Sequence, residues 1–442
     1  MKEKLTISQK LAKRKYRPPL RIISSLYKFI MVDIVSRKYK PKFHKIDKVS
    51  DCDGPCFVIF NHLSRIDHAY LAGACYPRRT NMMAAFNEFF RSKFSFIFAL
   101  NKVIPKKNYS ADVISIRGVS EVLKRGGCVT FAPEGVASDF GCNKPIVPGT
   151  SKMFKHFKVP VYLCYLEGQF LQNTKVCLDE RYGETHATTT LLFSKEDVER
   201  LSVEEMDDII NEKFRRNEYE WNREKKIKWK TNGRICHRLE DYCYKCPKCK
   251  SEFTMLGTGN KIECLNCGNG ATMDDYYVFH PYENAVIPID PCVWAEQERM
   301  DVIKEIRADL NYVFEDDCKI GNIDEYKLVK SKNPTYIVGE GKISVDHKGL
   351  HYKGTRNGEP YEFSVGYKNL YTFFVATDTN AFSLYVKGEY FEIYPKRKTV
   401  GKILLLVEEM HRYHINYYKN FKWNDYMYEG MELGIDLKQD NK

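Results

Sequence analysis

One histidine and one carboxylate are spaced in a way that suits proton transfer. His62 and Asp67 lie five positions apart, immediately after the short apolar run Cys56–Phe60. A run of this kind indicates a buried strand, and a helix that begins beyond it would bring the carboxylate to the imidazole. Asp67 would then hold one ring nitrogen of His62, and the other nitrogen could take a proton from a hydroxyl. The sequence therefore predicts a general base that is oriented by a carboxylate.

A second block of interest lies about one strand–helix–strand unit later in the chain. The sequence Pro-Glu-Gly at residues 133–135 again follows an apolar, strand-like run. Together with the heptapeptide NHLSRID at residues 61–67, and in this order, it resembles the signature of the glycerolipid acyltransferase family, NHxSxxD followed by Pro-Glu-Gly. The resemblance covers roughly residues 45–220 and is complete for the first motif. It implies that His62 is the general base and that Asp67 orients it.

The resemblance also implies residues that hold the acceptor. Lys106 and Lys107, in the sequence KVIPKK, stand where the family places a cation, usually Arg, on the acceptor's phosphate. Glu134 would position the acceptor, and Gly135 would allow its close approach to the backbone. The family commonly continues with Thr, whereas this chain has Val136, so the identity of the acceptor stays open.

The stretches around these residues alternate in the manner of an α/β domain. Between about 49 and 200, short apolar runs alternate with helical patterns. A capping-box sequence at Ser202 and Glu205 then begins a helix that is predicted to continue toward Glu220. The predicted strands are 56–60, 81–85, 127–131, 159–166 and 188–193.

Four cysteines further along have the spacing of a metal site. Two C-x-x-C pairs, Cys246 with Cys249 and Cys264 with Cys267, are separated by fourteen residues. This spacing matches a four-thiolate zinc ribbon, with a small hairpin predicted between the pairs over 253–262. Four thiolates complete a tetrahedral shell and leave no position for water, so a zinc ion held here would be structural.

The C-terminal part is predicted to be mostly β. Residues 286–330 have the pattern of a connector with one helix at about 293–312. Six alternating runs then predict strands, and a final amphipathic helix follows them. Several strands closed by one helix loosely resemble the pleckstrin-homology-like fold, whose members often bind lipid headgroups or peptides. A domain that serves only for packing fits the pattern equally well. The predicted strands are 335–345, 349–354, 359–364, 371–376, 381–386 and 390–394.

The predicted protein is therefore multidomain, with an α/β acyltransferase domain, a small zinc ribbon and a mostly β domain with one C-terminal helix. Its length of 442 residues exceeds one ordinary compact core. The predicted parts are a basic, amphipathic membrane-associating segment (1–48), the acyltransferase domain (49–230), the zinc ribbon (231–285), a helical connector (286–330), the pleckstrin-homology-like β domain (331–425) and a tail (426–442).

Composition and charge indicate which partners and which cellular compartment to expect. Hydrophobic residues make up 43% of the chain and charged residues 29%, as in globular proteins. The net charge of +12 favours anionic partners, either nucleic acid or acidic lipid headgroups. No secretory signal precedes the fifteen cysteines, so reduced thiols in the cytosol are expected. The chain lacks a run of eighteen apolar residues, so no conventional membrane span is expected.

The segment 21–35 is predicted to be an amphipathic helix that lies on a membrane. Ile22, Leu26 and Phe29 recur near helical spacing, and lysines and arginines flank the segment on both sides. A core helix with a basic neighbour is the alternative. The Phe-rich stretch at 89–100 fits core packing and lipid contact equally well.

These observations predict an O-acyltransferase that moves a fatty acyl group from acyl-CoA or acyl-carrier protein to a lysophospholipid hydroxyl. The simplest acceptor is 1-acyl-sn-glycerol-3-phosphate, which would become phosphatidic acid in phospholipid biosynthesis. The enzyme would act peripherally on the cytoplasmic side of a membrane, with a structural zinc and no nucleic-acid partner. The alternative is a zinc-ribbon module that binds nucleic acid or protein and carries a vestigial acyltransferase domain. The ordered catalytic set favours the enzyme, because a binding module has no reason to keep it.

Overall fold

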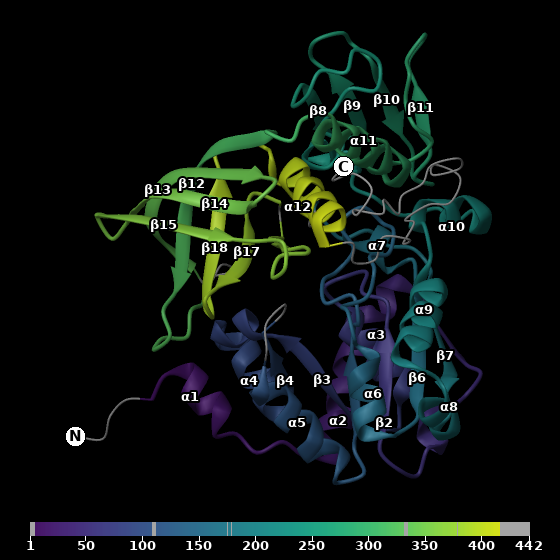
Figure 1. Cartoon of the computed structure of the whole chain (residues 1–442). Coiled ribbons are helices and arrows are strands. Elements are labelled where there is room, and N and C mark those ends of the chain that lie inside the picture. Colours follow the sequence, from purple (N-terminus) through teal and green to yellow (C-terminus); the bar gives the residue numbers. More distant parts are fainter. Residues whose placement is uncertain are drawn as a thin grey trace.

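Three β-sheets and the helices around them make up the protein (Figure 1). The structure, a computed structural model, describes residues 5–107, 112–174, 176–177, 179–330, 335–377 and 379–415. The N-terminal sheet fills the lower part of Figure 1, the cysteine-rich sheet lies above it, and the C-terminal sheet lies at the upper left. The predicted fold class is confirmed, with an α/β part, a small cysteine-rich part and a mostly β part in that order.

The N-terminal sheet has seven strands in the order β1-β7-β6-β2-β5-β3-β4. Its neighbouring strands are parallel, except that β6 and β7 are antiparallel. The central strand β2 is buried along its whole length, which explains its unbroken apolar sequence. All five predicted strands are confirmed, while the short strands β1 and β4 have no clear strand pattern. The strands are β1 Pro41–Lys45, β2 Cys56–Phe60, β3 Thr80–Ala85, β4 Ile104–Lys106, β5 Cys128–Phe131, β6 Val161–Glu167 and β7 Thr185–Phe193.

Two helices replace the single helix that the sequence predicts from Ser202 toward Glu220. The capping box is present, because Ser202 and Glu205 each accept a hydrogen bond from the backbone N–H of the other. The first helix nevertheless ends at Phe214, and the side chain of Asn217 caps the second. The helices of this part are α1 Ile7–Ala12, α2 Arg21–Lys28, α3 Asp67–Cys75, α4 Ser92–Leu100, α5 Val113–Leu123, α6 Ser151–Phe157, α7 Gln169–Gln172, α8 Lys195–Arg200, α9 Val203–Phe214 and α10 Glu218–Lys225, with a π-helical stretch Phe29–Val35 and 3₁₀ turns Ser36–Tyr39, Val49–Asp51 and Phe86–Phe90.

The cysteine-rich part forms a four-stranded antiparallel sheet in the order β11-β10-β9-β8. The predicted hairpin is confirmed as β8 and β9. Gly259 lies in the turn between them with a φ of +59°, a left-handed conformation that disfavours residues with a Cβ. The elements are a 3₁₀ turn Leu239–Asp241, β8 Met255–Thr258, β9 Lys261–Cys264, β10 Gly270–Met273 and β11 Phe279–Pro281.

The C-terminal sheet has seven antiparallel strands in the order β15-β14-β13-β12-β18-β17-β16. The helical connector predicted over 286–330 requires a correction, because it also contains β12, which pairs with β13 and β18. Asp316 occupies a buried position of β12, where Arg397 and Thr399 bind it, and so interrupts the alternation that reveals a strand. The elements are α11 Pro291–Ala308, β12 Val313–Ile323, β13 Thr335–Asp346, β14 Gly349–Arg356, β15 Glu359–Val365, β16 Phe374–Val375, β17 Phe382–Val386, β18 Glu389–Pro395 and α12 Val400–Ile415.

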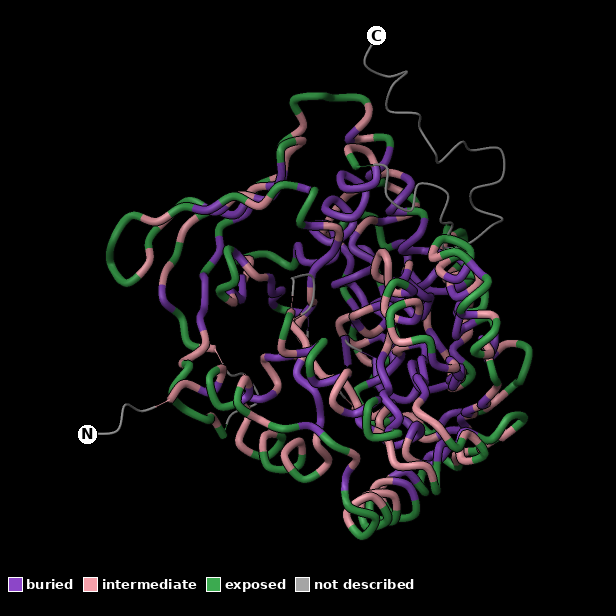
Figure 2. The backbone as a smooth tube through the Cα atoms, turned by 60° about the horizontal axis from the view of Figure 1, so that its bottom comes forward, coloured by how far each residue is buried: buried purple, intermediate pink, exposed green. Residues whose placement is uncertain are grey.

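One hydrophobic cluster joins the three sheets. It includes Val58 of β2, Ile262 of β9, Trp294 of α11 and Leu404 of α12, each at most 1% exposed. Figure 2 shows the buried segments gathered in the interior of the molecule. A second cluster, with Phe57 of β2, covers the other face of the N-terminal sheet. Among the described residues, each helix is too short or too polar to cross a lipid bilayer.

Candidate active site and metal centre

His62 and Asp67 form a hydrogen-bonded pair at the carboxyl end of β2. His62 Nδ1 lies 2.7 Å from Asp67 Oδ2. The Asp67 side chain is 2% exposed, whereas that of His62 is 29% exposed. An ionised carboxylate only accepts hydrogen bonds, so Nδ1 carries the ring proton and Nε2 keeps its lone pair. The two residues are therefore arranged as their spacing predicts, with Nε2 as the basic atom.

The turn between the two residues fixes the carboxylate. Asp67 is the first residue of α3, and its oxygens accept from the N–H of Leu63 at 2.8 Å and from the N–H of Ser64 at 3.0 Å. The Ser64 hydroxyl donates to Oδ1 at 2.8 Å. Three donors besides His62 therefore hold the carboxylate and fix its direction.

Asn61 anchors the start of the same turn to a neighbouring strand. Its side-chain amide donates to the carbonyl oxygen of Leu166 at 2.8 Å and accepts from the N–H of Leu166 at 2.7 Å. This pair joins the end of β2 to β6. Our sequence reasoning gave Asn61 and Ser64 no role of their own, although a polar residue where a buried strand ends is a signal for such an anchor.

The Pro-Glu-Gly block lies beside His62 and holds its backbone. Glu134 Oε2 accepts from the N–H of His62 at 2.8 Å, and Oε1 accepts from the N–H of Lys144 at 2.9 Å. The carbonyl oxygen of His62 accepts from the N–H of Ser138 at 2.8 Å. Both polar backbone groups of the predicted base are thus bound by one segment, residues 133–147, which we call the clamp loop.

Gly135 and Glu134 of the clamp loop each have an unusual local property. Gly135 has a φ of +75°, so this position favours glycine for conformational reasons. Glu134 is 3% exposed. Burial raises the pKa of its carboxyl group to about 7, although the N–H groups of His62 and Lys144 favour the ionised form. Glu134 therefore changes charge near neutral pH. Contact of either residue with the acceptor stays a prediction.

Lys106 and Lys107 lie, like His62, at the carboxyl ends of the parallel strands, but three strands away from it. Lys106 ends β4, and β3 and β5 separate β4 from β2. Neighbouring strands lie about 4.8 Å apart, so the backbones are roughly 14 Å apart. Burial lowers the pKa of Lys106, while Asp112 opposes this shift. The Lys107 ammonium group lies 4.8 Å from the centroid of the Phe86 ring. Binding of a phosphate by these lysines stays a prediction.

His68 follows Asp67 but contacts a different partner. Its Nδ1 lies 2.7 Å from the hydroxyl of Tyr27 in α2. Burial lowers the pKa of His68 to about 4, so its ring is neutral at neutral pH. His68 therefore links the helix that begins with Asp67 to α2.

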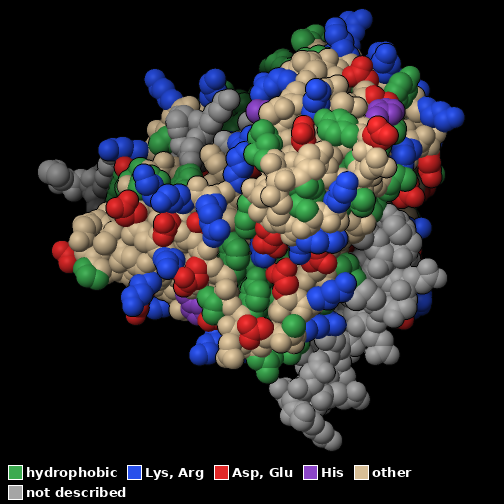
Figure 3. All heavy atoms as spheres, turned by 90° about the horizontal axis from the view of Figure 1, so that it is seen from above, with side chains coloured by type: hydrophobic (Ala, Val, Ile, Leu, Met, Phe, Trp, Pro, Cys, Tyr) green, Lys and Arg blue, Asp and Glu red, His purple; other side chains and the backbone are tan. Residues whose placement is uncertain are grey.

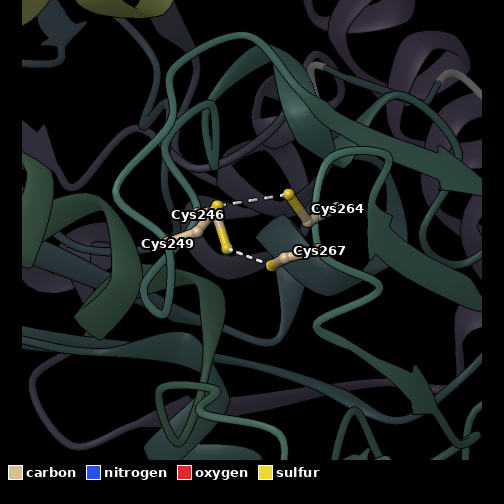
Figure 4. Close-up of side chains that lie close together, drawn as sticks. All are labelled: Cys246, Cys249, Cys264 and Cys267. Carbon is tan, nitrogen blue, oxygen red and sulfur yellow. Dashed lines mark hydrogen bonds between the residues drawn. The ribbon is translucent and has the colours of Figure 1, made fainter.

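The four cysteines predicted to bind zinc lie together at one end of the cysteine-rich sheet (Figure 4). All four sulfur atoms lie within 4.8 Å of one another, and the pairs Cys246–Cys267 and Cys249–Cys264 are 3.7 Å apart. Zinc with four Zn–S bonds of about 2.3 Å would place its sulfur atoms about 3.8 Å apart. The hydroxyl of Ser251 lies 2.9 Å from Cys249 Sγ and lowers the pKa of that thiol to about 5, which favours the metal-binding thiolate. The cluster could therefore hold one metal ion such as zinc.

Residues 14–167 match the model of a protein family described as Acyltransferase, and both motifs lie inside this region. No curated protein matches the chain in sequence. Among solved structures, the chain is similar to the 1-acyl-sn-glycerophosphate (LPA) acyltransferase PlsC from Thermotoga maritima, with 17% identity over 45% of this chain and 80% of that one, and a TM-score of 0.34. It is also similar to the RAN binding domain of the nuclear pore complex component NUP2 from Ashbya gossypii, with 17% identity over 23% of this chain and 97% of that one, and a TM-score of 0.18.

Proposed function

We propose that the acyltransferase-family domain of this chain moves a fatty acyl group from an acyl thioester to the hydroxyl of a lysophospholipid. The donor is acyl-CoA or acyl-carrier protein, and the simplest acceptor is 1-acyl-sn-glycerol-3-phosphate, which gives phosphatidic acid. One observation carries the proposal. Within a region that matches the acyltransferase family, Asp67 holds Nδ1 of His62 at 2.7 Å and leaves Nε2 as the base.

The proposed reaction needs one proton to move out and back. His62 Nε2 takes the proton of the acceptor hydroxyl while that oxygen attacks the thioester carbonyl carbon. Asp67 stabilises the imidazolium that forms. The tetrahedral intermediate expels the thiolate, which takes the proton from Nε2 and leaves as the free thiol. A C–O bond has then replaced the C–S bond, His62 is restored, and no acyl-enzyme is required.

The proposed enzyme lies on a membrane surface through residues 20–34, which we call the apolar segment. Ile22 is 74% exposed and Phe29 is 53% exposed, and an exposed apolar surface of this kind marks a contact with lipid or protein. Tyr27, in the same segment, binds the residue that follows Asp67. A bilayer that covers the apolar segment would therefore lie near α3, the helix that begins with Asp67. The other exposed apolar residues of the segment are Leu20, Leu26, Ile30 and Ile34.

The proposed role of the four-cysteine cluster is structural. Four thiolates complete a tetrahedral zinc shell, so Cys246, Cys249, Cys264 and Cys267 would hold the metal with no position open to substrate. When bound, the zinc would cross-link the two cysteine pairs, of which the first precedes β8 and the second begins at the last residue of β9. It would take no part in acyl transfer.

Purified full-length protein assayed with a panel of acyl donors and lysophospholipids tests the proposed reaction. We expect free thiol and acylated lipid to form in equal amounts. His62→Ala should abolish transfer, whereas His156→Ala, which removes an exposed imidazole from α6, should leave it unchanged. Transfer by folded His62→Ala at the rate of the unmodified protein would overturn the mechanism. Lack of transfer by the unmodified protein to every acceptor would overturn the function.

The binding-module alternative receives no specific support from the surface in Figure 3. On this face, seen from above, lysine and arginine side chains are scattered among aspartate and glutamate side chains. Proteins that bind nucleic acid gather positive charge into a stripe or patch. The His62–Asp67 geometry favours the enzyme.

A further inference from the structure

A buried ionic cluster connects the clamp loop to the C-terminal helix. The ammonium group of Lys144 lies 2.6 Å from Asp139 Oδ2, within the loop, and 3.0 Å from Glu408 Oε1, in α12. Lys144 is 4% exposed, Asp139 is 3% exposed and Glu408 is 2% exposed. The contact between Lys144 and Glu408 joins groups that are 264 residues apart in sequence, with little solvent to screen it.

Glu408 is itself fixed by its neighbours. Its Oε2 lies 2.9 Å from Nη2 of Arg299 in α11, and its Oε1 accepts from the hydroxyl of Thr372 at 2.8 Å. The adjacent Glu409 lies 2.9 Å from Nη1 of the same arginine. On the other side of the cluster, the hydroxyl of Tyr242 donates to Asp139 at 2.9 Å. The charge that faces Lys144 therefore has a defined position, set by the C-terminal part of the chain.

The clamp loop transmits this position to the predicted base. The N–H of Lys144 binds Glu134, whose other oxygen binds the N–H of His62. Ser138, next to Asp139, binds the carbonyl oxygen of His62. Fixing the side chain of Lys144 thus fixes both hydrogen bonds that hold the backbone of His62.

We propose that Glu408 is a positioning residue for the acyltransferase site, acting through Lys144 and the clamp loop on His62. The domain that carries the family motifs then depends on the C-terminal part of the chain for its active geometry, and not only for stability. This inference rests on the proposed function, in which His62 is the base. A positioning residue changes the rate of the chemical step, because small displacements of a base are costly, and it leaves substrate binding nearly unchanged.

The test compares Glu408→Gln with Glu409→Gln in the full-length protein. Both glutamates are 2% exposed and both bind Arg299, but only Glu408 contacts Lys144. We expect Glu408→Gln to lower kcat by about tenfold or more, with KM for donor and acceptor changed less than about twofold. The matched Glu409→Gln variant should retain kcat within about threefold at a temperature where both variants are folded.

Backbone hydrogen exchange gives a readout that does not need the enzymatic assay. Glu408→Gln should speed exchange in peptides that cover the clamp loop and residues 61–67, whereas Glu409→Gln should not. If the unmodified protein transfers no acyl group, the proposed function fails, while the exchange comparison still decides the inference. If Glu408→Gln does not fold, Thr372→Val removes one hydrogen bond from the same carboxylate without changing charge, and should show the same pattern in weaker form. Equal losses in the Glu408 and Glu409 variants, or unmodified kcat and exchange in a folded Glu408 variant, would overturn the inference.

Discussion

The backbone N–H of His62 and the carboxylate of Glu134 are joined by a hydrogen bond of 2.8 Å across 72 residues of sequence. The bond connects the NHLSRID motif to the Pro-Glu-Gly motif, which the sequence presents as two separate blocks. It gives Glu134 a clear structural task, because its two oxygens hold the N–H of the base and the N–H of Lys144. The two motifs, which are separate in sequence, are therefore in direct contact in the structure.

Replacing Asp67 with Asn should remove most of the activity while the protein stays folded. The amide can turn its NH2 group toward Nδ1 of His62, which favours the tautomer with the ring proton on Nε2, so we expect kcat to fall by about 10³- to 10⁴-fold. In that orientation the N–H of Leu63 would also lose its acceptor, at a cost of about 1–3 kcal/mol in the free energy of unfolding. Steady-state kinetics and thermal unfolding measure the two effects separately. Activity within tenfold of the unmodified enzyme would contradict the assigned roles.

Glu134 should make stability depend on pH. Its carboxyl group has a pKa of about 7 in the folded protein, against 4.5 as its ordinary value. Between these values the folded state holds more protons than the unfolded state, so the free energy of unfolding should fall as pH rises, by up to about 3 kcal/mol from this group. Glu134→Gln cannot titrate and should flatten the dependence between pH 4.5 and about 7. Unfolding by denaturant at a series of pH values measures the slope for both proteins, and equal slopes would refute the prediction.

The parts of the site that sequence reasoning predicted are those whose partners are close along the chain. His62 and Asp67 are five residues apart, and the turn between them closes locally. The clamp loop was not predicted, because Glu134 and Ser138 bind backbone groups of His62, and a backbone N–H or carbonyl has no sequence signature. The same holds for Lys144, whose partner Glu408 lies on an element formed at the other end of the chain.

In the fold, too, the elements that depend on nearby residues were predicted, and the strand that depends on distant residues was not. Unbroken apolar runs such as β2 predicted the N-terminal sheet, and the glycines at 257 and 259 predicted the hairpin between the two cysteine pairs. The strand β12 was missed because Asp316 takes a core position. Its charge is acceptable there only through Arg397 and Thr399, which lie more than eighty residues later.

Replacing Cys249 or Cys267 with Ser should destabilise the protein through loss of its metal. The unmodified protein should contain one zinc per chain by elemental analysis, and each variant should contain little. We expect the melting temperature to fall on the order of 5–10 °C, because binding energy for a structural metal contributes to folding. Cys52→Ser, which removes a partly buried thiol outside the cluster, should keep its zinc. Full stability of a preparation that contains no zinc would contradict the proposed metal site.

Charged substitutions in the apolar segment should weaken membrane binding without unfolding the protein. The segment 1–40 cannot simply be deleted, because Tyr16 within it is fully buried. Ile22→Asp combined with Phe29→Asp changes two side chains that are 74% and 53% exposed, so the fold should tolerate both. Inserting each side chain into the interface contributes about 1–2 kcal/mol, so the double variant should bind anionic liposomes roughly 30- to 700-fold more weakly.

Flotation of the proteins with liposomes measures this binding, and Leu310→Asp serves as the matched control. Leu310 is 69% exposed but lies after α11, far along the chain from the apolar segment. Its substitution should leave binding unchanged. Binding of the unmodified protein should also weaken as salt rises, because the flanking lysines and arginines are attracted to anionic headgroups. Activity of the double variant on a short-chain acceptor dispersed in detergent should be retained, since the His62–Asp67 pair is untouched. Equal liposome binding by all three proteins would place the membrane contact elsewhere, with the exposed Phe96 of α4 as the next residue to test.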